Sequence, residues 1–165
     1  MLKIFQAVVL FFTVVTAAAQ GNPKPPVFTP LSAESKAELD EFRRLVNRMV
    51  SKRNPGQMLS RAPKDFRVLQ TLAEDPSIKH ADRNTWIALG VAYGDALIAF
   101  VPGLSRSEVH DEYGPGVVLR YKRTTLTIAA PVMFAKRVER GETFDVPFMA
   151  NELKKYVQEN AGKIQ

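Results

Sequence analysis

The sequence predicts an α+β fold in which helices pack on one face of a small three-stranded antiparallel meander. Two observations lead to this prediction. Apolar residues recur at steps of three and four through much of residues 32–100, which is the period of amphipathic helices. After residue 107 the period changes to two, and turn residues separate three short alternating runs, as in antiparallel strands.

Composition supports a single globular domain. The chain has 165 residues, of which 45% are hydrophobic and 24% charged, values that argue against a disordered chain or a multi-span membrane protein. It contains no cysteine, which excludes disulfides, cysteine-ligated zinc, iron–sulfur clusters and thiol catalysis. Lys and Arg number 23 against 17 Asp and Glu, so the net charge is +6.

The N-terminus has the features of a secretory signal peptide. Lys3 gives a positive start, residues 4–16 are almost entirely apolar, and Ala17 and Ala19 match the small-residue preference of signal peptidase. We therefore expect a signal peptide over residues 1–19, with an uncleaved anchor as the alternative. Because secreted animal domains of this size usually carry disulfides, a cysteine-free chain favours the bacterial periplasm, with release to the medium second.

The remaining chain divides into a leader and one domain. Four prolines between residues 20 and 31 predict an extended, flexible leader, and a single α+β domain is expected over residues 32–162. Its first helix is predicted over residues 32–54, with an apolar stripe on one side and ended by Pro55 and Gly56.

Two more helices are predicted before the sheet, over residues 63–74 and 81–100. Asp82 is a plausible N-cap for the second of these. Gly90 and Gly94 lie four residues apart on it, and small residues at that spacing let a neighbouring element approach the helix closely.

Three strands are then predicted over residues 108–113, 117–121 and 125–130, joined by a Gly-Pro-Gly turn and a second short turn. Two helices follow. Pro131 lies in the first turn of one, and Asp145 caps the other, whose inner side is expected to include Phe148.

Four short motifs follow one another between Trp86 and Leu153. They are Leu-Gly and Gly-Asp at residues 89–90 and 94–95, Asp-Glu-Tyr-Gly at 111–114, Pro-Val-Met at 131–133, and Lys-Arg-Val-Glu-Arg-Gly-Glu at 136–142. In their order and spacing they resemble a bacterial family of uncharacterised envelope and cytoplasmic domains, a domain of unknown function. The resemblance implies a compact α+β domain and supplies no activity, cofactor or catalytic residue.

The densest group of polar residues surrounds the first strand's end. On a strand, Asp111 and Tyr113 share one face while His110 and Glu112 share the other. A metal would need a third ligand, and the one other histidine is His80, so we expect neither a metal nor a cofactor. Two interpretations stay open: a solvated strand end, or a buried Asp111 that pairs with Lys136 or Arg137.

Catalysis and nucleic-acid binding find little support in the sequence. It contains neither a Gly-x-Ser-x-Gly nor a Ser-x-x-Lys motif. The basic residues of the first helix stand beside acidic ones, and aromatic residues are not interleaved with them as in single-strand binders. We therefore expect no catalytic residues and no nucleic-acid partner.

Two functions remain from different classes. The first is an exported, non-enzymatic module, adaptor-like or immunity-like, that binds an envelope protein or an acidic surface through the sheet's edge, the turn at 113–117 and residues 136–142. The second is a small-ligand-binding or hydrolytic domain with a pocket between the sheet and the third helix. The candidate interaction or pocket residues are Trp86, Tyr93, Asp95, Asp111, Glu112, Tyr113, Lys136 and Arg137. A structural accessory of the envelope and the oligomeric state are left open.

Overall fold

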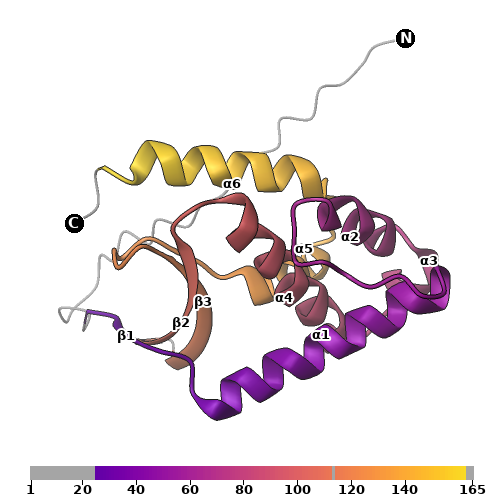
Figure 1. Ribbon diagram of the computed structural model, residues 1–165, viewed down its shortest axis with the longest axis horizontal. Coiled ribbons are helices and arrows are strands. Elements are labelled where there is room, and N and C mark those ends of the chain that lie inside the picture. The colour runs from indigo at the N-terminus through magenta and orange to yellow at the C-terminus, as the bar shows by residue number, and fades with distance from the viewer. Residues whose placement is uncertain (1–24, 113, 163–165) are drawn as a thin grey trace, which may run out of the picture.

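The computed structural model describes residues 25–112 and 114–162 and has helices around a central helix, with an antiparallel sheet on one side (Figure 1). The predicted signal peptide and Tyr113 lie outside the described residues. Within the described residues, no helix is both long enough and apolar enough to span a membrane. The predicted α+β class is confirmed.

The central helix is α4 (Arg83–Phe100), which follows the predicted helix closely. Its N-cap is Asp82, whose carboxylate accepts a hydrogen bond from the Thr85 N–H at 2.8 Å. Residues 88–97 are all buried, because neighbouring elements contact α4 on several sides. The helix is therefore the scaffold to which both the sheet and the other helices attach.

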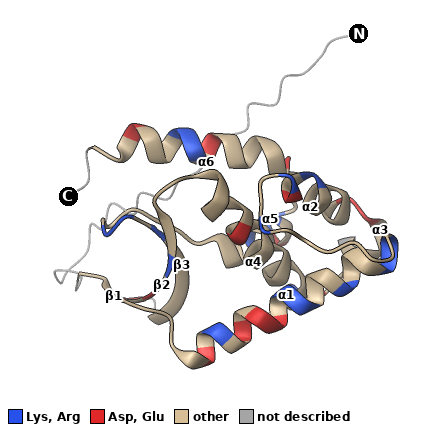
Figure 2. Ribbon diagram, in the orientation of Figure 1, with Lys and Arg blue, Asp and Glu red and all other residues tan. Residues whose placement is uncertain are grey.

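In the described part of the chain, α1 (Ala33–Arg53), α2 (Asp65–Ala73) and α5 (Ala130–Glu139) pack directly against α4, while α3 (Pro76–Lys79) and α6 (Val146–Asn160) pack against α2. Helix α1 carries charged residues of both signs along its length (Figure 2). Helix α3 is a single turn, and helix α5 lies along α4.

The sheet has four strands in the order β1-β2-β3-β4, all antiparallel, so the predicted three-strand count is wrong. Strands β2 (Leu104–Asp111), β3 (Gly114–Tyr121) and β4 (Thr127–Ile128) form the expected meander. The added strand, β1 (Val27–Thr29), pairs with β2 so that Phe28 lies opposite Val109.

Strand β1 was not predicted because its residues lie inside the Pro-rich segment that was assigned to the leader. Pro26 and Pro30 flank three residues of high β-propensity, Val, Phe and Thr. Proline has no N–H to donate to a ladder and is tolerated at sheet edges, so the two prolines keep this edge strand short.

Aliphatic and aromatic side chains from α4, α5 and β3 meet in one core, where Tyr93, Phe134 and Leu119 are fully buried.

Gly90 allows α5 to approach α4 at van der Waals distance. A Cβ placed on Gly90 would lie 2.5 Å from the carbonyl oxygen of Ala130 and would also overlap that of Pro131. At Gly94 the added Cβ would meet the Ala130 side chain and the Arg106 guanidinium at 3.2 Å, which is a milder contact. The predicted close approach is therefore made by α5.

A buried ion network joins α1, α4 and β2. The Arg43 guanidinium donates to both Asp95 carboxylate oxygens, at 2.7 and 2.8 Å. Arg106 donates to Asp95 Oδ1 at 2.7 Å through Nη2, and the same nitrogen donates to the Val91 carbonyl oxygen at 2.7 Å. The side chains of Asp95 and Arg106 are 7% and 6% exposed, so the charges compensate one another inside the protein.

Replacing Asp95 with Ala should strongly destabilise the fold, because it leaves the buried Arg106 without a counter-charge. Breaking a buried pair in this way costs about 3–5 kcal/mol, and we expect a loss of that order in the free energy of unfolding measured in urea at pH 7. Asp40→Ala is the matched control, since Asp40 pairs with the same Arg43 but is 53% exposed. We expect its loss to be about 1 kcal/mol or less, and equal losses would contradict the role given to Asp95.

The same variant has a pH signature. Burial alone would raise the pKa of Asp95, but the hydrogen bonds and charges of Arg43 and Arg106 outweigh burial and lower the pKa below its ordinary 3.8. A lowered folded-state pKa stabilises the protein above the unfolded-state pKa, and this contribution is lost as the pH falls through the folded-state value. The stability difference between wild type and Asp95→Ala should therefore be constant near neutral pH and shrink below about pH 4.

Gly90→Ala should destabilise the protein more than Gly94→Ala. The first change forces a methyl group against backbone carbonyl oxygens, whereas the second meets the end of a side chain and a methyl group. Overpacking a tight interface costs about 1–3 kcal/mol. Thermal unfolding of the two variants tests this order, and a Gly90→Ala protein as stable as wild type would refute the close packing described for α4 and α5.

Candidate functional site

Of the three candidate residues on α4, two lie on the same face of the helix and the third, Asp95, lies on the opposite face. Tyr93 lies seven residues after Trp86, about two helical turns, and Asp95 lies nine after it, which places Asp95 on the opposite side. Tyr93 is fully buried between the rings of Phe66 and Phe134. Arg106 fills the space where Asp95 faces the sheet, so the structure does not bring the three together in a pocket between the sheet and α4.

The other candidate residues also separate. Asp111 and Glu112 are exposed at the end of the β2–β3 hairpin, at the opposite side of Figure 1 from α2 and α3. Lys136 is exposed on α5, and Arg137 donates to Glu142 Oε2 at 2.9 Å. Among the described residues, no three His, Asp or Glu side chains are placed to hold a metal ion.

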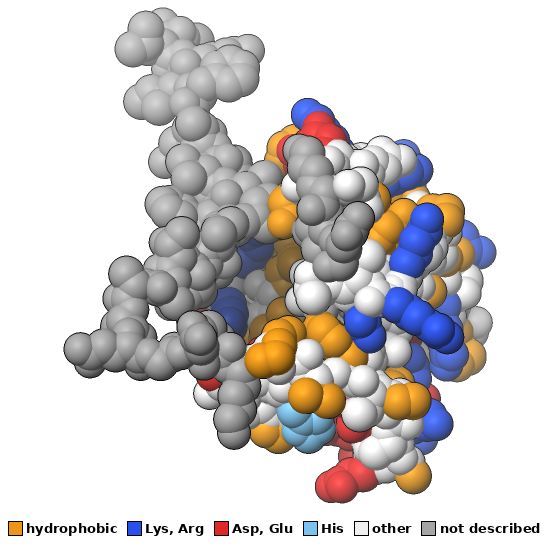
Figure 3. Space-filling model, turned by 90° about the vertical axis from the view of Figure 1, so that its left-hand side faces the viewer, with side chains coloured by type: hydrophobic (Ala, Val, Ile, Leu, Met, Phe, Trp, Pro, Cys, Tyr) orange, Lys and Arg blue, Asp and Glu red, His pale blue; other side chains and the backbone are white. Residues whose placement is uncertain are grey.

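The sheet side of the molecule shows a mixed surface. In Figure 3, hydrophobic side chains are interspersed with Lys and Arg side chains, which are concentrated on one side of that view. Val27, on the edge strand β1, is 59% exposed.

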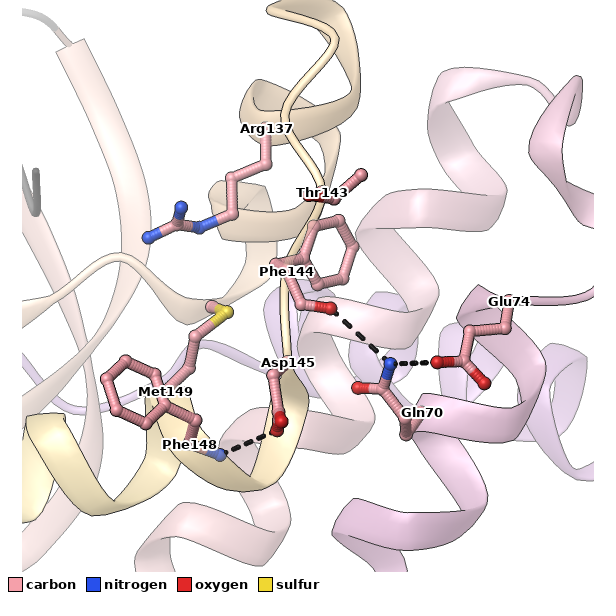
Figure 4. A pocket seen from close by; sticks show the side chains of 8 residues that line it. All are labelled: Gln70, Glu74, Arg137, Thr143, Phe144, Asp145, Phe148 and Met149. Carbon is pink, nitrogen blue, oxygen red and sulfur yellow. Dashed lines mark hydrogen bonds between the residues drawn. The ribbon is translucent and has the colours of Figure 1, made fainter. Parts of the chain in front are cut away.

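The structure has a cleft on the far side of α4 from Asp95, which the sequence analysis did not identify. Two pockets of about 360 and 540 Å³ adjoin there. They share four lining residues from α2 and from the segment between α5 and α6: Gln70, Glu74, Thr143 and Phe144. We call the two together the Phe144 cleft, and Figure 4 shows the smaller pocket.

Gln70 fixes the segment that forms one wall of the cleft. Its side-chain oxygen accepts a hydrogen bond from the Val146 N–H at 2.6 Å, while its nitrogen donates to Glu74 Oε1 at 2.7 Å and to the Phe144 carbonyl oxygen at 3.4 Å (Figure 4). Asp145 caps α6 by accepting from the Phe148 N–H at 2.9 Å. The wall is therefore tied to α2 and to the start of α6.

Aromatic rings connect the cleft to the core. The Phe144 ring lies 6.3 Å from the Trp86 ring and 4.9 Å from that of Phe134, and Phe134 lies 5.2 Å from Tyr93. Phe144 is half-buried and lines both pockets, while Trp86, which is 4% exposed, lines the larger one. A ligand in the cleft would thus rest on rings that the core holds in place.

Phe148 lies at the rim of the smaller pocket and is 47% exposed. The expectation that it faces inward is wrong, because the helix turns Met149 and Ala150 into the core and leaves Phe148 beside the opening. An exposed aromatic ring next to a recessed aromatic wall is an arrangement typical of binding surfaces.

Three buried hydrogen-bond donors in this region have no partner among the described residues. They are Trp86 Nε1, Tyr93 Oη and Arg137 Nε. Burial raises the pKa of Tyr93 well above its ordinary value of 10.0, against the nearby charge of Arg137, so its hydroxyl stays protonated at neutral pH. Trp86 and Arg137 both line the cleft, and their unpartnered donor atoms are buried.

The carboxylates of the cleft fall into two kinds. Glu142 is paired with Arg140 at 2.5 Å and with Arg137 at 2.9 Å, and these contacts lower its pKa below 4.5 although its partial burial opposes this. Glu74 and Asp145 are exposed, and within the described residues neither forms an ion pair with Lys or Arg. The cleft therefore carries negative charge in a chain whose net charge is positive.

Two of the predicted candidate residues, Trp86 and Arg137, line this cleft, as does Glu142 from the predicted contact segment 136–142. Gln70, Glu74 and Phe144 were not predicted. Gln70 lies on the polar side of an amphipathic helix, where glutamine carries no special signal. Its role depends on Val146, which is 76 residues away in the sequence. The one local signal was Asp145, which was correctly identified as a helix cap.

Comparison with known families assigns the chain to a family. The model of the family described as Domain of unknown function (DUF3806) matches residues 65–149, just over half of the sequence. The chain therefore belongs to that family, which agrees with the resemblance to an uncharacterised domain family. The matched segment runs from α2 to the start of α6 and includes every lining residue of the Phe144 cleft.

One solved structure shares the fold. It is a crystal structure from Bacteroides thetaiotaomicron VPI-5482, with a TM-score of 0.69 and 18% sequence identity. The match covers 83% of this chain and 50% of that one, so this chain spans about half the length of that protein. At this identity the likeness shows the fold alone. No curated protein matches this chain.

Replacing Gln70 with Ala should loosen the segment around Phe144, because the Val146 N–H and the Phe144 carbonyl oxygen lose their partner. We expect faster amide hydrogen exchange at residues 143–146, measured by mass spectrometry, while α4 stays protected. Gln158→Ala, an exposed position on α6, is the matched control and should leave exchange unchanged. Unaltered exchange in Gln70→Ala would show that other contacts fix the segment.

Proposed function

We propose that this member of the family is an exported, non-enzymatic binding module that holds a segment of a partner protein in the Phe144 cleft. The observation that carries the proposal is the exposed Phe148 ring at the rim of a cleft whose inner wall is also aromatic. Partner chains commonly bury such an aromatic anchor next to a pocket, where a few residues supply most of the binding energy.

The cleft is suited to binding because its walls are fixed before a partner arrives. Gln70 ties the segment at Phe144 to α2, and the Asp145 cap sets the start of α6. A rigid site loses little conformational freedom on association, which favours affinity. The lining groups include aromatic rings, an amide and carboxylates, which can contact both apolar and polar groups of a partner protein.

Export remains part of the proposal. The signal-like residues 1–19 support secretion, and an envelope location supports a partner protein found in the periplasm or the medium. The positive net charge supports a weak attraction to the acidic surfaces of the envelope. A small fold with a cleft that binds a partner protein is compatible with an adaptor or an immunity-like inhibitor.

A small-ligand-binding domain is the second candidate. The larger pocket, of about 540 Å³, falls within the range of small-molecule sites, and the unpartnered Trp86 Nε1 supplies a buried donor. This pocket lies at the start of α4, away from the position between the sheet and α4 that the sequence suggested. A small molecule would fill the pocket without covering Phe148.

Photocrosslinking at two exposed hydrophobic positions tests the partner-binding proposal. A photoreactive amino acid replaces either Phe148 or Met58, which are 47% and 66% exposed, in the full-length protein made by its own cells. We expect the probe at 148 to form a crosslink to one defined protein and the probe at 58 to form none. An intact mass beginning at Gln20 would confirm signal removal in the same sample.

The crosslinked partner is then purified, and its affinity for Phe148→Ser and Met58→Ser proteins is measured. Loss of a central aromatic anchor typically weakens binding by about 2 kcal/mol, or roughly thirtyfold, so Phe148→Ser should bind much more weakly and Met58→Ser as wild type. Equal affinity of the two variants would exclude the Phe144 cleft as the contact surface.

A further inference from the structure

We propose that the Phe144 cleft recognises a cation on an apolar stem, as in a Lys or Arg side chain of the partner, with Glu74 and Asp145 as the receiving carboxylates. This inference rests on the proposed function and adds the chemical class of the ligand. Its two independent bases are the unpaired carboxylates and the unpartnered donor of the nearly buried Trp86.

Glu74, at the end of α2, and Asp145, which follows Phe144 directly, both line the smaller pocket (Figure 4). Glu74 accepts a hydrogen bond from the neutral Gln70 amide, and Asp145 accepts one from a backbone N–H, so neither of these contacts is with a cationic group. Each carboxylate also has further acceptor sites available. An ammonium or guanidinium group bound in the pocket would form charge-assisted hydrogen bonds with a carboxylate of its lining.

The net charge of the cleft lining stays negative when its other charged groups are included. Arg137 and Glu142 pair with each other, and Glu142 also binds Arg140, which is exposed outside the pockets. His80 borders the larger pocket and is exposed. Counting Glu74, Asp145 and Glu142 against Arg137, the lining carries two more negative than positive charges when His80 is neutral.

Rings lie beside the carboxylates. Phe144 and Phe148 line the same pocket as Glu74 and Asp145, and Trp86 lies behind Phe144. Aromatic faces attract cations and also pack against the methylene stem of Lys or Arg. The combination of ring and carboxylate therefore favours a cation on an apolar stem over an anion or a purely apolar group.

The donor of Trp86 selects a second feature of the ligand. Trp86 is 4% exposed, lines the larger pocket, and has no acceptor for Nε1 among the described residues. A buried donor without a partner is costly, so a ligand that brings a carbonyl oxygen to it gains that free energy. A polypeptide supplies a carbonyl beside a basic side chain, whereas a simple amine supplies the cation alone.

Tryptophan fluorescence gives a direct test, because Trp86 is the one tryptophan in the sequence. The full-length protein is titrated at low salt with acetyl-Phe-Arg-amide, with the neutral acetyl-Phe-citrulline-amide, and with agmatine as a free guanidinium compound. We expect the arginine peptide to shift the Trp86 emission and to bind at least about fivefold more tightly than the citrulline peptide.

A double variant, Glu74→Gln with Asp145→Asn, removes both charges and keeps the hydrogen bonds, since Asn also serves as an N-cap. It should lose that fivefold preference. Glu38→Gln, an exposed position on α1, is the matched control and should keep it. Equal binding of the two peptides by wild type, or an undiminished preference in the double variant, would overturn the inference.

Different outcomes of these experiments distinguish a wrong cation specificity from a wrong partner-binding site. If the partner still crosslinks at position 148 in the double variant with unchanged affinity, partner binding stands and the cation specificity is wrong. If agmatine binds as tightly as the arginine peptide, the cation specificity stands and the source is a small amine instead of a polypeptide. Circular dichroism of each variant confirms that it is folded.

Discussion

The buried pairing of Asp95 with Arg43 and Arg106 is the interaction on which the arrangement of this fold depends. Through one carboxylate it joins α4 to the neighbouring strand β2 and to α1, whose Arg43 is 52 residues away in the sequence. Charges removed from water are tolerated when each finds its partner and the geometry is good, as it is here at 2.7 Å for both arginines. The network thereby ties both α1 and β2 to the same residue of α4.

The two ends of helix α4 contribute to different features of the protein. Asp95 belongs to the structural network, while Trp86, nine residues earlier and about 14 Å away along the axis, lines the Phe144 cleft. Between them Gly90 lets α5 approach, and α5 carries Arg137 to the cleft. The position of the cleft thus follows from how α4 is anchored at its other end.

Local patterns in the sequence predicted much of the fold and little of the site. The periodicity and caps located α1, α4 and α6 to within a few residues, because helix ends depend on near neighbours. Strand β1 was missed because its partner lies about 80 residues away. Asp95 was read as a pocket residue for the same reason, since Arg43 is 52 residues distant and no spacing rule links them.

Backbone amide shift mapping by nuclear magnetic resonance tests the central claim, that binding occurs in the Phe144 cleft and not at the hairpin end. The labelled protein is titrated with acetyl-Phe-Arg-amide, and the perturbed amides are mapped on the structure. The account predicts shifts in residues 70–74 and 142–149 and at the Trp86 indole, with residues 108–112 and 114–117 unchanged. Shifts confined to the hairpin, or an unperturbed cleft at millimolar peptide, would contradict it.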